Sequence, residues 1–89
     1  MNTLDLTIAS VAQTFFDGEA VSVIVPGVLG EMQILANHAA IISNLQKGRV
    51  IIEKVDGEKE VMIIQGGILE HSNNHTTLLV ESPDPAAKP

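Results

Sequence analysis

The stretch RVIIEKVDGEKEVMII, residues 49–64, has a turn signal between two apolar runs and predicts a β-hairpin. A two-residue loop at Asp56-Gly57 would set lysine opposite lysine and glutamate opposite glutamate. A three-residue loop over 55–57 instead sets each lysine opposite a glutamate, as in the pair Glu53 and Lys59. We therefore expect the three-residue loop, with Gly57 in the left-handed conformation that glycine adopts most easily.

The runs 50–52 and 61–64 on either side of this turn contain only Val, Ile and Met. Such runs are apolar on both faces of a strand, whereas a half-buried strand alternates between apolar and polar residues. Either both faces are covered within the chain or one face is presented to a partner. The sequence leaves these two alternatives open.

Further short segments outside the hairpin also have the character of strands. In TLDLTIAS, residues 3–10, Leu4, Leu6 and Ile8 alternate with other residues, which predicts a half-buried strand. No run is long and periodic enough to predict a helix. The chain is therefore predicted to be all-β, an antiparallel sandwich or barrel of short strands. The other predicted strands are 14–17, 21–25, 31–35, 41–45, 67–71 and 76–80, with turns at Asp17-Gly18, Pro26-Gly27, Lys47-Gly48, Gln65–Gly67 and Asn73-Asn74.

Length and composition exclude several classes of protein. Eighty-nine residues suffice for one ordinary core but not for two. Eleven acidic against five basic side chains give a net charge of −6, the wrong sign for binding nucleic acid. The chain has no Trp or Tyr to stack on bases, and no Cys for disulfides, thiolate metal sites or catalytic thiols.

The two ends of the sequence carry expectations of their own. Residues 1–12 have no basic start and include Asp5, so they do not resemble a secretory signal. No stretch is long enough to insert into a membrane, and we expect a cytosolic protein. At the other end, SPDPAAKP contains three of the four prolines. We therefore expect one β-sandwich domain over residues 1–82 and a disordered, Pro-rich tail over residues 83–89.

The segment GEMQILANHAAI, residues 30–41, places the ionisable His38 between two apolar runs. Glu31 lies seven residues earlier, so a pair of histidine and carboxylate for acid-base chemistry is one interpretation. No nucleophile stands in a recognisable setting, because Ser22 and Ser43 occupy predicted strands without an elbow motif. A polar contact residue is the simpler hypothesis for His38.

His71 and His75 are the other two histidines. Their spacing would bring them together on a helix, but a turn separates them here, where they could still be cross-strand neighbours. We expect no functional metal site from two such residues. The glycines of 27–30 and 65–67 precede neither a helix start nor a Lys-Ser/Thr pair, so no phosphate-binding loop and no cofactor is expected.

Two segments carry a resemblance to a known family. They are GEMQILANHA at 30–39 and GGILE at 66–70, within an order of strands that covers roughly residues 4–82. This order resembles the amino-terminal β-sandwich of the epsilon subunit of F-type rotary ATP synthases, called delta in mitochondria. The resemblance implies an antiparallel sandwich of about ten short strands. It also implies a non-catalytic central-stalk subunit that couples the gamma subunit to the membrane c-ring of a proton-translocating enzyme, at the cytoplasmic face of the bacterial inner membrane.

The resemblance also assigns contacts residue by residue. Glu31, Met32 and Gln33 would face the polar loops of the c-ring. Ser10, His38 and Ser43 would lie near gamma. Asn37 stands where the family commonly has Gly, and Asn is the side chain that best tolerates left-handed backbone. Ala36 and Ala40 replace family prolines, so the loop between them has fewer restraints.

Many family members continue into a carboxy-terminal helical hairpin, and residues 83–89 contain nothing able to build one. We expect no such hairpin in this chain. Two rival hypotheses stay open. One is an unrelated cytosolic β-sandwich protein-interaction module that binds an extended peptide along an exposed edge strand. The other is a small hydrolase or isomerase that uses Glu31 and His38.

Overall fold

A computed structural model describes residues 2–81 of the chain, and these residues form eight strands and no helix. Each segment that the sequence predicts as a strand lies in a strand, and the prediction of an all-β sandwich is confirmed. The strands are β1 (Leu4–Ala9), β2 (Thr14–Gly27), β3 (Gly30–Leu35), β4 (Ile41–Leu45), β5 (Gly48–Lys54), β6 (Lys59–Ile64), β7 (Gly67–Ser72) and β8 (His75–Val80).

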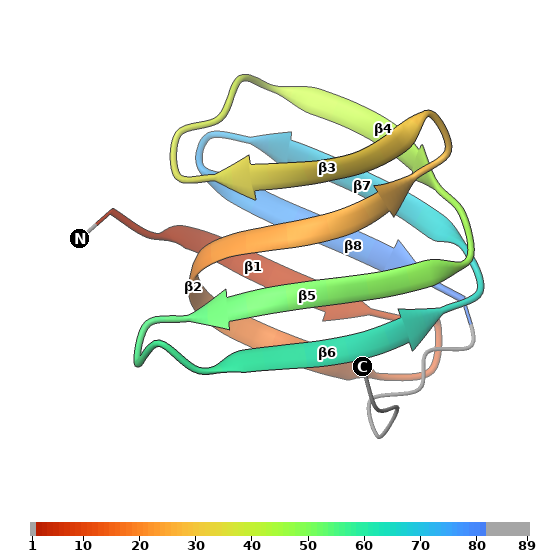
Figure 1. Cartoon of the computed structure of the whole chain (residues 1–89), viewed down its shortest axis with the longest axis horizontal. Coiled ribbons are helices and arrows are strands. Elements are labelled where there is room, and N and C mark those ends of the chain that lie inside the picture. Colours follow the sequence, from red (N-terminus) through yellow and green to blue (C-terminus); the bar gives the residue numbers. More distant parts are fainter. Residues whose placement is uncertain (1, 82–89) are drawn as a thin grey trace.

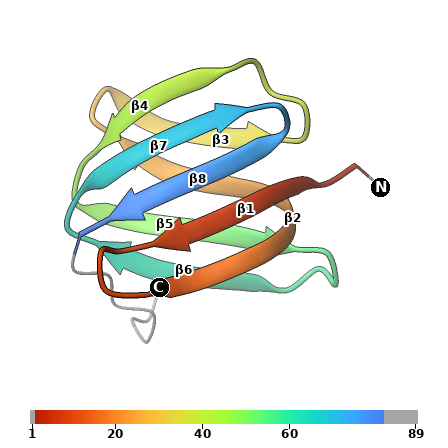
Figure 2. The same cartoon turned by 180° about the vertical axis from the view of Figure 1, so that it is seen from behind.

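The strands lie in two layers that face each other. One layer contains β3, β2, β5 and β6 and is nearest the reader in Figure 1. The other contains β4, β7, β8 and β1, and Figure 2 shows it from its outer side. The hydrogen-bonded order runs β1-β8-β7-β4-β2-β5-β6, and β3 and β1 also pair with β2. β2 therefore links the two layers.

The length of β2 corrects two turn predictions from the sequence. The turn predicted at Pro26-Gly27 lies two residues later, because β2 continues to Gly27. A turn is predicted at Asp17-Gly18, but the strand continues through both residues and is 14 residues long. Asp17 pairs with Thr7 and Gly18 with Leu6 of β1, while the second half of β2 pairs with β3 and β5. These ladders outweigh the local preference of Asp-Gly for a turn. Two predicted strands merge, which leaves eight, fewer than the resemblance implies.

The pair of β1 and β8 departs from the predicted antiparallel arrangement. These strands run parallel, with Leu6 beside Thr76 and Ile8 beside Leu78, whereas the other strand pairs within residues 2–81 are antiparallel. A parallel pair joins segments that no short turn connects, so local turn signals do not reveal it. It places β8 between β1 and β7 and completes the second layer.

One hydrophobic core fills the space between the layers. The alternation in β1 turns Leu4, Leu6 and Ile8 inward as predicted, and none is more than 1% exposed. The half-buried Met32 and Ile41 pack against this core, together with the two phenylalanines. The other core side chains are Ala20, Val23, Val25, Ile34, Leu45, Val50, Ile52, Met62, Ile64, Leu69, Leu78 and Val80.

The β5–β6 hairpin has the register that its charges predict. Glu53 lies opposite Lys59, and Gly57 has a left-handed φ of 91°. The main-chain amide of Lys54 donates to the carbonyl of Glu58 at 2.8 Å, which closes a three-residue loop. The prediction of this loop is confirmed.

Asparagines form two of the other turns. Asn73 and Asn74 join β7 to β8 with φ values of 50° and 60°, and Asn37 has a φ of 65°. The expectation that Asn37 tolerates left-handed backbone is therefore confirmed.

Gly67, at the start of β7, lies closer to another strand than a larger residue could. Its φ is 154°, and a Cβ atom placed there would collide with the main-chain oxygen of Leu79. Glycine at this position lets the start of β7 approach the end of β8.

The predicted domain and its tail extend beyond residues 2–81, the part of the chain that the structure describes. Residues 4–80 form one sandwich, and the tail predicted for 83–89 lies outside the described residues. The end of the domain at residue 82 therefore stays a prediction. The described part of the chain has no helix of the length and apolarity needed to cross a membrane.

Candidate interaction surface

Four apolar side chains lie exposed on the outer side of the β4-β7-β8-β1 layer and in the loop that follows β1. Val11 is fully exposed, and Ile42, Ile68 and Leu79 are 69%, 40% and 53% exposed. We call these four residues the apolar strip. Aliphatic side chains gathered on one face are typical of a surface that another molecule covers.

The register of the strands makes the apolar strip continuous. Ile68 of β7 lies directly opposite Leu79 of β8. Ile42 of β4 joins them, because all three line one surface hollow of about 280 Å³ together with Glu70 and Thr77. The strip therefore crosses three neighbouring strands.

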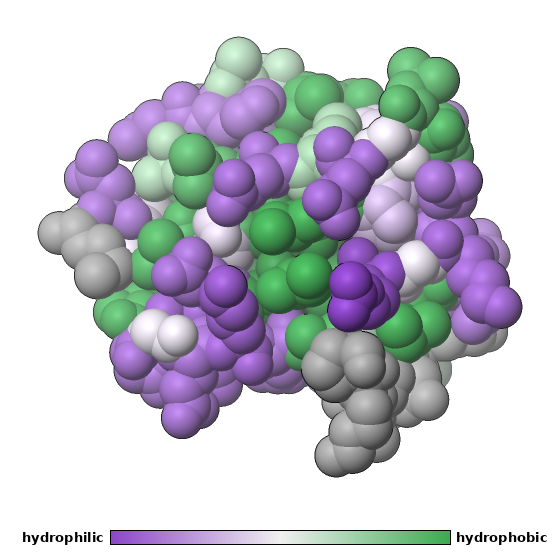
Figure 3. Space-filling model, viewed as in Figure 1, coloured by the Kyte–Doolittle hydropathy of each residue, from purple (hydrophilic) through white to green (hydrophobic). Residues whose placement is uncertain are grey.

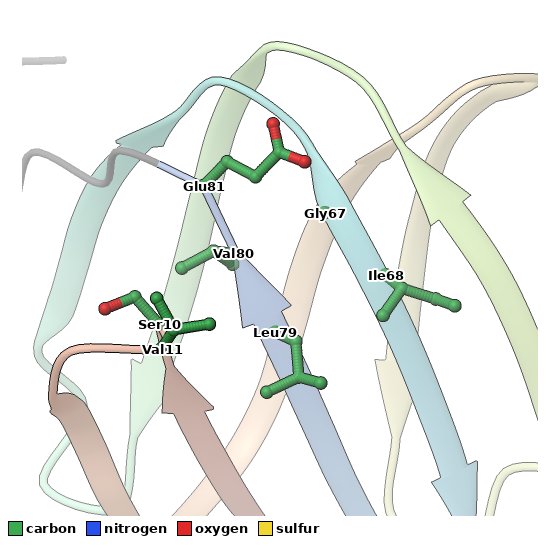
Figure 4. Close-up of a pocket in the computed structure, with 7 residues that line it drawn as sticks. All are labelled: Ser10, Val11, Gly67, Ile68, Leu79, Val80 and Glu81. Atoms are coloured by element: carbon green, nitrogen blue, oxygen red, sulfur yellow. The ribbon is translucent and has the colours of Figure 1, made fainter.

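A second hollow, of about 350 Å³, extends the strip to the β1–β2 loop. Figure 4 shows Ser10 and Val11 just beyond the end of β1, beside Leu79 and Val80 of β8. Ile68 lies on the neighbouring strand, and Glu81 stands at the end of β8. The carboxylate of Glu81 adds a charged group at the rim of this apolar hollow.

The sequence contains a signal for the strip that strand periodicity alone does not reveal. The pairs Ile41-Ile42, Ile68-Leu69 and Leu78-Leu79 each set two aliphatic residues side by side in a strand. Since successive side chains point to opposite faces, one member of each pair enters the core and the other faces outward. Leu69 and Leu78 are fully buried, whereas their neighbours Ile68 and Leu79 are exposed.

In the runs 50–52 and 61–64 of the other layer, side chains likewise alternate between the core and the outer face. Their inward side chains are core residues, and Ile51, Val61 and Ile63 are half-buried on the outer side. Apolar groups gather at the centre of this face, over β2, β5 and β6 (Figure 3). Within the described residues no element covers them, so the alternative in which both faces are covered internally is wrong for this part of the chain.

Ser10, a predicted gamma contact, shapes the loop that carries Val11. Its Oγ accepts hydrogen bonds from the amides of Ala12 at 3.1 Å and Gln13 at 3.3 Å. Its own amide donates to the carbonyl of Gln13 at 2.9 Å. The serine therefore closes the tight loop at one end of the apolar strip.

Ser43, a second predicted gamma contact, lies next to Ile42 but turns the other way. It pairs with Leu69, whose side chain is buried, and it is itself half-buried. Its hydroxyl donates to the main-chain oxygen of Asn44 at 3.3 Å, and it lines a hollow together with Met32. Ser43 therefore lies at the edge between the layers rather than on the strip.

His38, the third predicted gamma contact, lies in the exposed β3–β4 loop. Its Nδ1 donates to the main-chain oxygen of Ala39 at 2.7 Å, and its ring stands edge-on to that of His71, with ring centroids 5.9 Å apart. The β3–β4 and β1–β2 loops occupy opposite corners of this layer (Figure 2). The structure thus keeps His38 and Ser10 apart, at different ends of the same side of the molecule.

The three predicted c-ring contacts lie next to one another on β3. Glu31 and Gln33 are exposed and pair with Pro26 and Ile24 of β2. Met32 between them is half-buried and packs against the core. The alternation of the strand therefore offers only Glu31 and Gln33 on the outer face.

His71 and His75 do not share a site. His71 lies opposite Thr76, with its Nδ1 2.6 Å from the Thr76 hydroxyl. His75 lies opposite Ser72 and is exposed, with its Nε2 3.2 Å from the Thr7 hydroxyl. Within residues 2–81, no three His, Cys, Asp or Glu side chains gather in a group that could hold a metal ion.

The polar groups do not form a catalytic arrangement in the described part of the chain. No hydrogen bond there joins His38 to Glu31 or to Ser43, and both His38 and Ser43 bond to the main chain of the next residue. The strip, by contrast, brings together four exposed aliphatic side chains. The geometry therefore favours a binding surface over an acid-base site.

The sequence matches a family model described as the beta-sandwich domain of the ATP synthase delta/epsilon chain, over residues 3–85. The chain belongs to this family. Similar epsilon chains of bacterial ATP synthases include that of Xylella fastidiosa, 42% identical over 82 residues, and that of Polaromonas naphthalenivorans, 38% identical over 82 residues. Each of these alignments covers 92% of this chain and 59% of the relative. The chain thus spans about three-fifths of the length of these epsilon chains.

Solved structures support the delta/epsilon fold. The chain aligns with one subunit in the cryo-EM structure of the Euglena gracilis mitochondrial ATP synthase, OSCP/F1/c-ring, with a TM-score of 0.89 and 20% identity over 96% of this chain and 54% of the other. A second match, in the central stalk/c-ring structure of the Tetrahymena thermophila enzyme, has a TM-score of 0.74 and 17% identity over 90% of this chain and 64% of the other. At these identities the likeness is one of fold.

Proposed function

We propose that this chain is a central-stalk domain of a rotary, proton-translocating ATP synthase and that it couples the gamma subunit to the membrane c-ring. The observation that carries the proposal is an apolar strip on a member of the delta/epsilon family. The solved structures with the same fold come from ATP synthases, one of them described as a central stalk with its c-ring. In this role the chain transmits torque and performs no catalysis.

The apolar strip is the surface that we assign to gamma. Ile68 and Leu79 lie at its centre, and both line each of its two hollows. Ser10 and His38 stand at different ends of this side of the molecule, so a partner that lies along the strip can reach both. Ser43 is half-buried beside Ile42, and we assign it a contact at the edge of the same surface.

The β2–β3 turn is the surface that we assign to the c-ring. Glu31 and Gln33 are exposed there, and Val28 and Leu29 at the tip of the turn are 51% and 100% exposed. Met32 packs against the core, so its contribution is to anchor β3 rather than to meet the c-ring loops directly. With this assignment, the c-ring meets a turn of this chain whose tip carries both acidic and apolar side chains.

The location follows from these two partners. The chain is held at the cytoplasmic face of the bacterial inner membrane, as a peripheral part of the complex, through gamma and the c-ring. The similar epsilon chains are from bacteria, which supports this assignment.

Association with purified gamma subunit from the same source tests the proposal. Calorimetry should give a dissociation constant below about 10 μM. Leu79→Asp places a charge in the strip and should weaken binding at least about tenfold, equivalent to roughly 1.4 kcal/mol. Val55→Asp is the matched control, because Val55 is 48% exposed, close to the 53% of Leu79, but lies in the β5–β6 loop.

Two results would count against the proposal. The first is no association at tens of micromolar, and the second is an equal loss of affinity in both variants. An unrelated interaction module would leave gamma unbound and add an extended peptide to an edge strand such as β6, which pairs only with β5 among the described residues.

A further inference from the structure

His71 is a buried imidazole that has a hydrogen-bond partner at only one of its two nitrogens among residues 2–81. The residue is 1% exposed. Its Nδ1 lies 2.6 Å from the hydroxyl of Thr76, which is fully buried, while its Nε2 is buried without a hydrogen-bond partner in the described part of the chain. A neutral imidazole has an N–H group at one nitrogen and an acceptor lone pair at the other. A protonated ring has N–H groups at both nitrogens and carries a charge. Protonation would therefore leave a charged N–H unpaired in the interior, which is costly.

The ring of His71 packs under the β3–β4 loop, residues 36–40. The His38 ring stands edge-on to it at 87°, with ring centroids 5.9 Å apart. Two further contacts hold the loop in the described part of the chain. The amide of Asn37 donates to the side-chain oxygen of Asn74 at 2.8 Å, and the amide of His38 donates to the carbonyl of Leu35 at 3.2 Å. Few contacts therefore oppose the opening of this loop.

The groups around His71 all make its charged form unfavourable, except one. Burial holds the pKa of His71 below its ordinary value, and the nearby His38 from the loop and His75 from β8 lower it further. The main chain of His38 raises the pKa, although no group among the described residues reaches hydrogen-bond geometry with Nε2. From β4, the residue opposite His71 is Ile41, which has no charge, and the Glu70 carboxylate of β7 is exposed on the outer side.

We propose that His71 is an acid-sensitive latch: protonation of its buried ring opens the β3–β4 loop and releases His38 from its packed position. Neutral His71 stabilises the closed loop. Because the ring in the closed loop resists protonation, this stabilisation is complete above the ordinary pKa of histidine, near 6.5. It is lost as the pH falls below that value toward the lowered pKa of the closed form. The β3–β4 loop is also the segment that we assign to gamma through His38, so regulation of gamma binding is the part of this inference that rests on the proposed function.

Hydrogen exchange of the free 89-residue chain tests the latch. Protection factors, which correct for the intrinsic pH dependence of exchange, are measured at the amides of Asn37 and His38 at pH 7.5 and pH 5.0. In the parent chain they should fall roughly tenfold at the lower pH, while core strands keep their protection. In His71→Leu they should stay constant. His75→Gln, which removes the exposed histidine, should behave like the parent.

The titration of the His71 ring in the parent chain, followed by NMR, gives a readout that needs no variant. It should occur below the ordinary histidine value. If His71→Leu does not fold, the double variant His71→Leu/Thr76→Val replaces the hydrogen-bonded pair by two apolar side chains. Titration at or above the ordinary value would overturn the latch. So would unchanged protection of the loop at pH 5.0, or the same loss of protection in the variant that lacks the imidazole.

Binding of gamma at the two pH values tests the regulatory part separately. The affinity of the parent chain should fall at pH 5.0, and that of the His71→Leu chain should fall less. If the loop opens but the parent and His71→Leu chains lose affinity for gamma equally, the proposal that His71 controls gamma binding is wrong. If gamma binds at neither pH, the proposed function fails, while the exchange of the free chain still decides the latch.

Discussion

Glycine at position 67 and histidine at position 71 show what single residues contribute to this sandwich. Gly67 has a φ of 154° and no room for a Cβ atom beside Leu79, so its role is visible only when β8 is in place. His71 is buried against Thr76 of the same hairpin and against His38, which lies 33 residues earlier in the chain. By contrast, Gly57 has the left-handed conformation that the local sequence alone predicts. Local turn chemistry can be predicted from sequence, whereas a contact between distant segments cannot.

Substitution of Gly67 should destabilise the chain more than substitution of Gly57. Gly67→Ala combines unfavourable φ with a collision against main-chain atoms, and should lower the free energy of unfolding by about 3 kcal/mol or more. Gly57→Ala at φ 91° meets nothing within 4 Å and should cost about 1–2 kcal/mol from backbone conformation alone. Urea unfolding of both variants measures the difference. Equal losses would mean that the close approach of β7 and β8 is not what requires glycine.

At the scale of strands, the sequence predicts hairpins better than it predicts their assembly. The charges around the β5–β6 turn select the register that the structure has, because a shift would set like charges opposite each other. The continuity of β2 through Asp17-Gly18 and the parallel pair of β1 with β8 depend on partners that no local pattern specifies. The adjacent aliphatic pairs in β4, β7 and β8 do predict a strand with two apolar faces, and the apolar strip is the result.

The register of the β5–β6 hairpin can be tested by exchanging its charges. Lys59→Glu sets two carboxylates opposite each other at Glu53 and should lower stability by about 0.5–1 kcal/mol. The exchange Glu53→Lys/Lys59→Glu restores opposite charges and should recover most of the loss. A double-mutant cycle from urea unfolding gives the coupling energy. No coupling between the two positions would contradict a direct cross-strand pair.

At the scale of the whole molecule, the two layers differ in how exposed the apolar side chains on their outer faces are. The outer apolar groups of β5 and β6 are half-buried, whereas each of the four strip residues is 40% exposed or more and lines a hollow. Aliphatic groups that a small acidic domain with a single core leaves in contact with water are typical of a surface that another molecule covers, and we assign this surface to gamma. The segments that carry the family resemblance predicted the fold and the family, whereas the positions of the site residues relative to the strip required the structure. The residue-level contacts with gamma and the c-ring stay predictions.

We propose that gamma covers the apolar strip, and thiol footprinting can locate the covered surface because the chain contains no cysteine. Leu79→Cys places a thiol in the strip, and Val55→Cys places one of similar exposure in the distant β5–β6 loop. Alkylation rates are measured with and without saturating gamma. We expect gamma to slow the reaction at position 79 about tenfold or more, while position 55 reacts at its free rate. Unchanged reactivity at position 79 in a chain that binds gamma would contradict it.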